Sequence, residues 1–190
     1  MTLFLRSTAA VAVAVLLAAC GSAKRGEGNY LLDDIEAQRN LPDSGWEALR
    51  PLLPPVPGPS DTLLPVDSLN VNDPFHYGVD PRSVQIAPGQ IVRYALVSQS
   101  DRGSRNISYE SVRCGTREYR LVALAAPGGA WQRAHNDEWQ PVQANTVQAV
   151  LRAGVLCSGG GVATDKVPNL IARLRNWSQY SDFTAEQNKP

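Results

Sequence analysis

The first residue with a specific chemical use is Cys20, which directly follows a short apolar run. The run covers residues 9–19, about half of the roughly twenty residues that a bilayer-spanning helix needs, and Arg6 is the only charged side chain before it. A basic start followed by a short apolar run is typical of a secretory signal. The four residues ending at Cys20, LAAC, match the bacterial lipobox, in which the cysteine thiol carries lipid as a thioether. We therefore predict a signal peptide over residues 1–19 and lipidation of Cys20, with palmitate among its acyl chains.

Lipidation would also fix the location of the protein. Each buried methylene contributes about 0.8 kcal/mol, so two or three acyl chains anchor a protein stably where one binds only reversibly. Gly21 follows the cysteine, whereas an aspartate there would resemble the inner-membrane retention signal of enteric lipoproteins. We expect a lipid-anchored protein on the periplasmic face, at the outer membrane.

The two remaining cysteines, Cys114 and Cys157, form a pair once Cys20 carries lipid. An even number of cysteines in an oxidising compartment favours a structural disulfide. A redox enzyme would more naturally carry a C-x-x-C pair, and the sequence contains none. We therefore predict a disulfide between these two residues.

The charge of the chain excludes broad attraction to polyanions. The 18 basic residues balance the 18 acidic ones, and removing Arg6 with the signal leaves 17 against 18, a net charge near −1. We therefore expect no nucleic-acid partner.

Basic residues are nevertheless in local excess between residues 93 and 120, where the sequence contains six arginines and only three acidic residues. This local excess could dock an anionic partner such as lipopolysaccharide phosphates or a peptidoglycan carboxylate, or it could belong to solvated strand faces. The candidate binding residues are Arg93, Tyr109, Glu110, Arg113 and Arg117.

Glu110 is the strongest candidate for a special environment. If residues 106–114 form a strand, Tyr109 and Arg113 lie on one face and Glu110 and Cys114 on the other. A buried Glu110 then needs a cation partner, for which Arg93 on the neighbouring strand is a candidate. Both a structural ion pair and a catalytic carboxylate remain open.

Two further patterns are weaker. His135 and Glu138 are three residues apart, which on a helical turn could direct both toward one metal ion, but no third ligand lies nearby. A surface loop is the alternative. The run from Ser158 to Gly161 lacks the Lys-Ser/Thr pair of a phosphate-binding loop, so we interpret it as a turn. We predict no catalytic residue, no metal and no cofactor.

The elements that position these residues follow from periodicity. The runs IVRYALVSQ and RNISYESVRC, followed by EYRLVALA, predict an antiparallel three-stranded meander, and FHYGV and SVQIA flank Asp80-Pro81 before it. Asn145 is expected to cap a helix that carries Val147, Val150 and Leu151. VPNLIARLRNW predicts a last short helix, with Pro168 near its first turn.

Together these patterns predict an α+β fold, a single domain around an antiparallel β-sheet with a few short helices, preceded by a Pro-rich extended segment. The expected organisation is a signal peptide over 1–19, a flexible tether over 20–29, a helix and the Pro-rich segment over 30–72, the α+β domain over 73–180 and a frayed tail over 181–190. Within the third segment, residues 30–39 form the predicted helix.

Several of these stretches together resemble the cryptic neisserial protein family of proteobacterial lipoproteins. The resemblance covers roughly residues 45–160. It departs from the family pattern at Ser111, where a glycine is expected. The residues that carry it are Trp46-Glu47, Asp61-Thr62-Leu63-Leu64, Asp80 with Ser83, 92–97, 106–114, Trp131, Trp139 and Leu156-Cys157. The resemblance implies a periplasmic, lipid-anchored protein and supplies no catalytic residues.

These observations lead to two competing expectations of function. The first is a non-enzymatic binding or assembly module of the bacterial envelope, attached to the membrane by its N-terminal lipid and bound to an envelope protein or an anionic envelope component. The alternative is an envelope hydrolase or metal-dependent enzyme that uses His135, Glu138 or Glu110.

Overall fold

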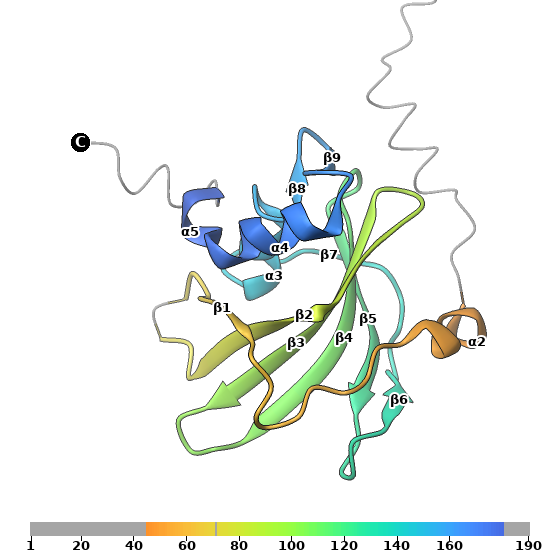
Figure 1. Ribbon diagram of the computed structural model, residues 1–190, viewed down its shortest axis with the longest axis vertical. Coiled ribbons are helices and arrows are strands. Elements are labelled where there is room, and N and C mark those ends of the chain that lie inside the picture. Colours follow the sequence, from red (N-terminus) through yellow and green to blue (C-terminus); the bar gives the residue numbers. More distant parts are fainter. Residues whose placement is uncertain (1–44, 71, 181–190) are drawn as a thin grey trace, which may run out of the picture. The chain divides into compact units, whose positions relative to one another are not determined.

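The computed structural model describes residues 45–70 and 72–180 (Figure 1). The predicted signal peptide, Cys20, the tether, the helix expected over 30–39 and the tail over 181–190 lie outside the described residues.

The centre of the described chain is a seven-stranded antiparallel sheet. Its strands run in the order β1-β2-β3-β4-β5-β6, and β7 pairs with β5. Neighbouring strands are consecutive in sequence along this path, so the predicted antiparallel sheet and its meander are confirmed. The strands are β1 (Leu64–Val66), β2 (Phe75–Ala87), β3 (Ile91–Ser100), β4 (Arg105–Arg113), β5 (Glu118–Ala125), β6 (Trp131–Arg133) and β7 (Gln140–Pro141).

Strand β2 is one long strand where the sequence suggested two short runs around Asp80 and Pro81. Its pairing with β3 shifts between Asp80 and Gln85, which marks a bulge. Inside the bulge, the Ser83 hydroxyl donates to the Asp80 carbonyl at 2.6 Å and accepts the Ala95 amide at 2.7 Å. Because Ser83 supplies the partners that the interrupted ladder lacks, the strand continues through a proline without leaving these buried groups unpaired.

The helices are short and lie on both sides of the sheet. Near the N-terminal end of the described chain are α2 (Trp46–Leu49) and the 3-10 helix η1 (Arg50–Leu52). The other helices are α3 (Val147–Arg152), α4 (Val167–Arg175) and α5 (Trp177–Tyr180), with the small hairpin β8 (Cys157–Ser158) and β9 (Gly161–Val162) between α3 and α4.

Two local predictions about helix starts have different outcomes. Pro168 lies in the first turn of α4, as predicted. The expected cap of α3 at Asn145 is wrong by one residue, because the Thr146 hydroxyl accepts the Ala149 amide at 3.3 Å. Asn145 instead has a φ of 62°, a left-handed conformation that an N-cap residue does not take.

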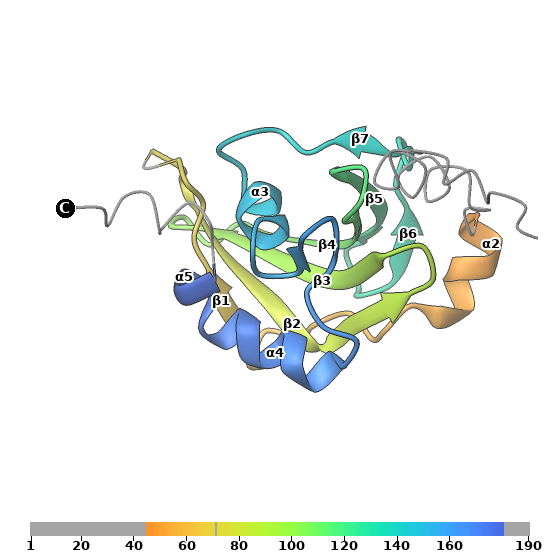
Figure 2. The same cartoon turned by 90° about the horizontal axis from the view of Figure 1, so that it is seen from above.

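The sheet buries side chains on both faces. The larger cluster lies under α3 and α4 and includes Val92, Tyr94 and Leu96, the alternating residues that predicted a half-buried β3. The smaller cluster, on the other face, joins Leu49 of α2 to Ala95 and Tyr109. Figure 2 shows α4 alongside β2 and α2 well apart from it, in agreement with the two clusters.

The segment between η1 and β1 is held by side chains of the sheet. Prolines cannot donate backbone hydrogen bonds, so this segment cannot form a regular ladder. Instead its carbonyls accept side-chain donors: the Trp131 indole reaches Pro54 at 2.6 Å, and Arg105 reaches Pro57 at 3.1 Å and Gly58 at 2.9 Å. Side chains from separate strands therefore fix one stretch of backbone.

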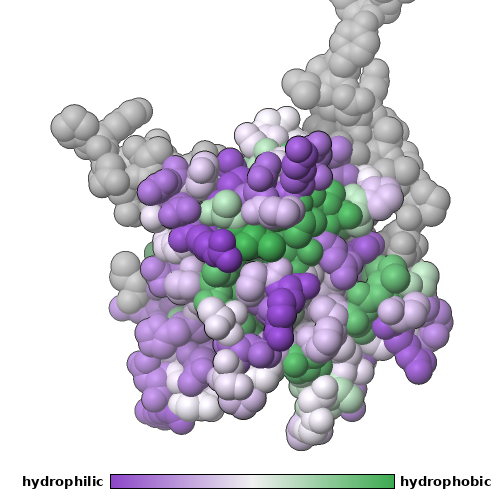
Figure 3. All heavy atoms as spheres, viewed as in Figure 1, coloured by the Kyte–Doolittle hydropathy of each residue, from purple (hydrophilic) through white to green (hydrophobic). Residues whose placement is uncertain are grey.

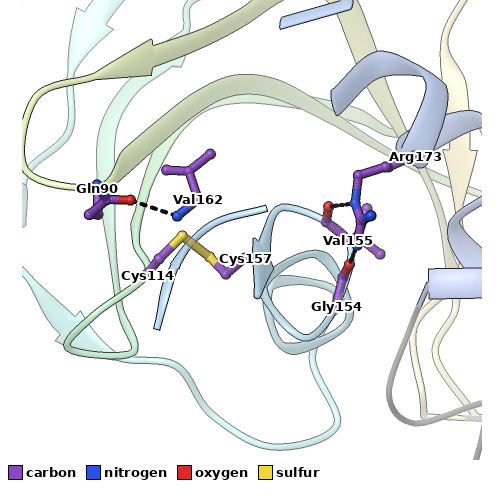
Figure 4. Close-up of a disulfide and its surroundings, with 7 residues drawn as sticks. All are labelled: Gln90, Cys114, Gly154, Val155, Cys157, Val162 and Arg173. Atoms are coloured by element: carbon purple, nitrogen blue, oxygen red, sulfur yellow. Dashed lines mark hydrogen bonds between the residues drawn. A yellow bond between two sulfur atoms is a disulfide. The ribbon is translucent and has the colours of Figure 1, made fainter. Parts of the chain in front are cut away.

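A disulfide joins the end of β4 to β8, as predicted, with the Cα atoms of Cys114 and Cys157 5.4 Å apart. Two further contacts hold the same region (Figure 4). The Gln90 side chain accepts the Val162 amide at 2.7 Å, and Arg173 of α4 donates to the carbonyls of Gly154 and Val155. The segment from α3 to β9 is therefore attached to the sheet on one side and to α4 on the other.

The surface is mixed in character. On the face shown in Figure 3, hydrophobic side chains gather near the centre and hydrophilic side chains surround them. Within the described ranges, no helix has both the length and the apolar character needed to cross a membrane.

Loss of the disulfide is expected to destabilise the domain substantially. The bond spans 43 residues of sequence, and closing a loop of that size contributes about 4 kcal/mol in the chain-entropy model. We expect urea unfolding of the Cys114→Ser/Cys157→Ser variant to show a loss approaching that size. Wild-type protein in reductant is the matched control and should lose the same amount. A loss below about 1 kcal/mol in both would contradict a structural role for the bond.

Candidate functional site

Glu110 is a buried carboxylate with neutral hydrogen-bond donors around it. Its side chain lies on the same face as Cys114, as predicted, and only 4% of the residue is exposed. Tyr94 donates to Oε2 at 3.2 Å and Ser108 donates to Oε1 at 2.8 Å. Gln148 of α3 donates to both oxygens, at 3.3 and 3.1 Å. The carboxylate therefore links two neighbouring strands and the helix that covers them.

The environment of Glu110 favours its protonated form. Burial raises the pKa of this carboxyl above its ordinary value, and the donors from Ser108, Gln148 and Tyr94 oppose the shift only in part. Burial and the nearby Glu110 raise the pKa of the Tyr94 hydroxyl as well. An enzyme can use such a carboxyl as a proton donor. Here the carboxyl is 4% exposed and is bonded to Tyr94 of the larger core cluster, which indicates a structural role.

The ion pair predicted between Arg93 and Glu110 is wrong. The register pairs Tyr94 with Glu110 and Arg93 with Ser111. Because directly opposed residues in an antiparallel pair point to the same face, Arg93 lies on the face of Tyr109 and away from the carboxylate. Burial raises the pKa of the Tyr109 phenol to about 12, and the positive charge of Arg93 opposes this shift in part.

Arg113 and Arg120 are buried and engaged within the domain. Arg113 is 4% exposed, donates to Glu118 at 3.2 Å and stacks its guanidinium 4.0 Å from the centre of the Trp139 ring. Arg120, also 4% exposed, pairs with Asp137 at 3.3 Å. Their charges are matched inside the fold, so they are not part of an open basic surface.

Tyr109 belongs to the smaller core cluster, on the face of the sheet opposite Glu110. It is 1% exposed, and its ring centre lies 5.9 Å from that of Trp131. Trp131 also holds the proline segment through Pro54, so Tyr109 supports the contact between that segment and the sheet. Of the five candidate binding residues, the structure leaves only Arg117 exposed.

Arg117 borders a hollow of about 380 Å³ beside the disulfide. The hollow lies between the β4–β5 turn and the segment from the end of α3 to the β8–β9 hairpin. Arg117 and Arg152 are the two charged residues in its lining, and both are cationic. The rest of the lining comprises the two disulfide cysteines, Ala153, Ser158 and four glycines, Gly115, Gly154, Gly159 and Gly160.

The turn that carries Arg117 has an unusual residue for its backbone shape. Arg117 has a φ of 57°, a left-handed conformation that hairpin turns of this kind usually assign to glycine or asparagine. In the described part of the chain, no hydrogen bond or ion pair engages its side chain. Glu118 next to it is already bonded to Arg113 and Thr116. Arg117 is therefore an exposed residue of the hollow's lining whose charge no described residue pairs.

The glycine run after Cys157 forms one wall of this hollow. Ser158 pairs with Gly161, and the two residues between them, Gly159 and Gly160, have φ values of 58° and 84°. This is the two-residue hairpin turn in which both central residues need positive φ. The interpretation of the run as a turn agrees with this geometry.

The structure does not support a metal site at His135 and Glu138. The segment between β6 and β7 is not helical, so the geometry required to bring both side chains to one ion is absent there, and both side chains are exposed. Within residues 45–70 and 72–180, no cluster of three or more His, Cys, Asp or Glu side chains is arranged to hold a metal ion.

Some important residues were missed from the sequence. Arg152 of the hollow ends α3 five residues before Cys157, so the predicted disulfide could have indicated that it approaches the β4–β5 turn. Tyr94 as a partner of Glu110 could have been found from the exact register of the hairpin, which depends on a loop whose length sequence patterns define poorly. Gln148 carries no such signal, because its contact depends on how α3 docks on the sheet.

Comparison with known proteins gives one result. A model of the CNP1-like family matches residues 42–175 of the 190-residue chain, which include the sheet, the disulfide and both arginines of the hollow. No curated protein and no solved structure matches the chain.

The buried carboxyl predicts a pH dependence that Glu110→Gln should remove. A raised folded-state pKa means that the folded protein keeps a proton that the unfolded chain releases near the ordinary value of 4.5. Wild-type stability should therefore fall as pH rises from that value through the folded-state pKa. The free energy of unfolding of the variant minus that of wild type should increase with pH across this window.

Urea titrations between about pH 4 and pH 8 measure this difference, with Glu138→Gln as the control because that carboxylate is exposed. The lowered pKa values of Asp61 and Asp137 affect both proteins equally and cancel in the difference. A difference that stays constant or decreases as pH rises would refute the assignment.

Proposed function

The chain belongs to the CNP1-like family, and from this membership and the disulfide we propose that it is a lipid-anchored periplasmic protein that acts as a non-enzymatic binding or assembly module of the bacterial cell envelope. Its ligand or partner docks on the domain, and the N-terminal lipid keeps the domain at the membrane.

The location rests on two independent features. The disulfide suggests an extracytoplasmic location, because thiols of cytosolic proteins are kept reduced. The lipobox ending at Cys20 supports attachment of the mature N-terminus to a membrane. The residue after the cysteine, Gly21, favours the outer membrane over the inner one.

The observation that carries the binding role is the distribution of charged side chains. The charges with a special environment, Glu110, Arg113 and Arg120, are enclosed by partners from the same domain and stabilise its two faces. Arg117, by contrast, is exposed and belongs to the lining of a hollow beside the disulfide. A domain whose buried charges are engaged by its own side chains, and which carries an exposed arginine beside a recess, suits recognition better than acid-base catalysis.

Crosslinking in living bacteria, followed by affinity purification and mass spectrometry, tests this proposal. Wild type should capture a specific envelope partner, and the Cys20→Ala chain, which cannot receive the lipid, should capture much less of it because it is not held at the membrane. Both forms are compared at equal abundance, with a tagged unrelated lipoprotein as the control for nonspecific capture. Failure of wild type to enrich any envelope component over that control would contradict the binding role.

A further inference from the structure

We propose that the outer edge of β6, the side that faces away from β5, pairs with the same edge of a second copy of this chain. The two sheets then join antiparallel into one. This pairing gives the proposed binding role a partner and a surface, and it rests on that role for the membrane anchor.

Strand β6 lies at one end of the strand order, at the edge of the sheet (Figure 1). Hydrogen bonds at its two ends show which backbone groups face β5. The Ala126 amide donates to the Ala130 carbonyl at 2.8 Å, and the Ala134 amide donates to the Val122 carbonyl at 3.1 Å. In the same register, Gln132 lies opposite Leu124, midway between these two bonded pairs.

The alternation of the backbone then leaves two residues of β6 facing outward. Successive residues of an antiparallel strand point their N–H and C=O groups to opposite sides, so Gln132 faces β5 as Ala130 and Ala134 do. Trp131 and Arg133 therefore point their N–H and C=O groups away from the sheet. Within residues 45–70 and 72–180, no hydrogen bond engages these backbone groups. They form an open edge to which another strand can add.

Other edge segments of the sheet carry a proline, whereas β6 does not. The middle residue of β1, at the opposite end of the strand order, is Pro65, and β7 ends at Pro141. Proline has no N–H to give to an added strand, and natural proteins use it to protect edges. In β6, Gln132 and Arg133 are both exposed. The edge that remains open to pairing is therefore that of β6.

The backbone of β6 matches its own copy in one antiparallel register. When Gln132 lies opposite Gln132 of the second copy, Trp131 of each chain lies opposite Arg133 of the other. Each Trp131–Arg133 pair can then exchange both of its N–H···O=C bonds, because all of these groups point outward. A strand that matches itself in this way suits the two-fold symmetry of a homodimer.

The side chains of β6 suit the same register. Arginine stacks favourably on tryptophan, and the two glutamine amides can bond each other. Arg133 is paired with Asp137 of its own chain at 2.8 Å, so the edge does not bring two unbalanced charges together. Leu124, opposite Gln132 on β5, is 42% exposed, so apolar surface borders the same edge. These features favour a second copy over a peptide of unrelated sequence.

The small size of the interface makes pairing depend on the membrane. Stable interfaces in solution bury about 1,000 Å² or more, which two strands of 3 residues each do not supply. Copies held by their lipids in one membrane meet at a much higher local concentration than free copies do, which compensates for a small interface. We therefore expect lipidated chains to pair and the Cys20→Ala chain to pair much less.

The experiment uses the full chain in living bacteria, produced in two forms that carry different affinity tags. After crosslinking, the complex is purified through one tag and the other tag is quantified. Gln132→Lys in both forms, or Gln132→Glu in both, places like charges opposite each other and should lower co-purification about threefold or more. Combining the Gln132→Lys form with the Gln132→Glu form should restore it. The matched control is Gln143→Lys, an exposed glutamine outside β6, which should co-purify as wild type does.

A photo-crosslinking amino acid at position 132 identifies what occupies the edge. The expected product is a dimer of this chain in which the linked peptide contains β6 of the second copy. A product with a different envelope protein, no co-purification of wild type, or co-purification that the charge at position 132 does not change would overturn self-pairing.

Failure of self-pairing can be distinguished from failure of the binding role. If self-pairing fails while wild type still captures a different envelope component, the binding role stands and acts on that component. If wild type captures neither a second copy nor any other envelope component, both proposals are wrong.

Discussion

The disulfide between Cys114 and Cys157 is the constraint on which the rest of the domain depends. It fixes the end of β4 to the segment that leaves α3. The chain between the two cysteines, which are 43 positions apart in sequence, is therefore closed into a loop that contains β5, β6, β7 and α3. Val155 and Leu156, fully buried beside the bond, join the core under the helices. Hydrophobic burial and a covalent bond therefore stabilise the same short segment. Together they keep very short helices packed against a long, curved sheet.

Charged groups are distributed according to the two faces of that sheet. Glu110 lies on the helix-covered face, where neutral donors satisfy it and burial favours its protonated form. The opposite face carries Arg113 and Arg120, each with an acidic partner. Arg117 has no such partner on either face, because it lies in the turn after β4, next to the disulfide. This exposed cation therefore lies beside a segment that the disulfide holds.

Much of the fold follows from the sequence because its determinants are local. Alternation of Val92, Tyr94 and Leu96 specifies which face of β3 is buried, and proline at position 168 marks the start of α4. The disulfide follows from counting cysteines in an oxidising compartment. Family membership is confirmed by a match that covers the sheet and the disulfide.

Contacts that depend on exact register or on docking were not predictable in the same way. The expected Arg93–Glu110 pair failed because a shift of one residue along β3 places Tyr94, not Arg93, opposite the carboxylate. The break expected at Asp80-Pro81 is bridged by Ser83, whose side chain replaces missing ladder partners. Arg152 joins Arg117 only after α3 has folded back to bring Cys157 to Cys114.

Mass spectrometry of the protein isolated from bacterial membranes, digested without reductant, tests most directly whether this is an extracytoplasmic lipoprotein with a disulfide-stapled domain. The expected result is an N-terminal peptide that begins at acylated Cys20, together with one species in which the peptides containing Cys114 and Cys157 are linked. An unmodified N-terminus that precedes Cys20, or free thiols at both other cysteines in the native protein, would contradict it.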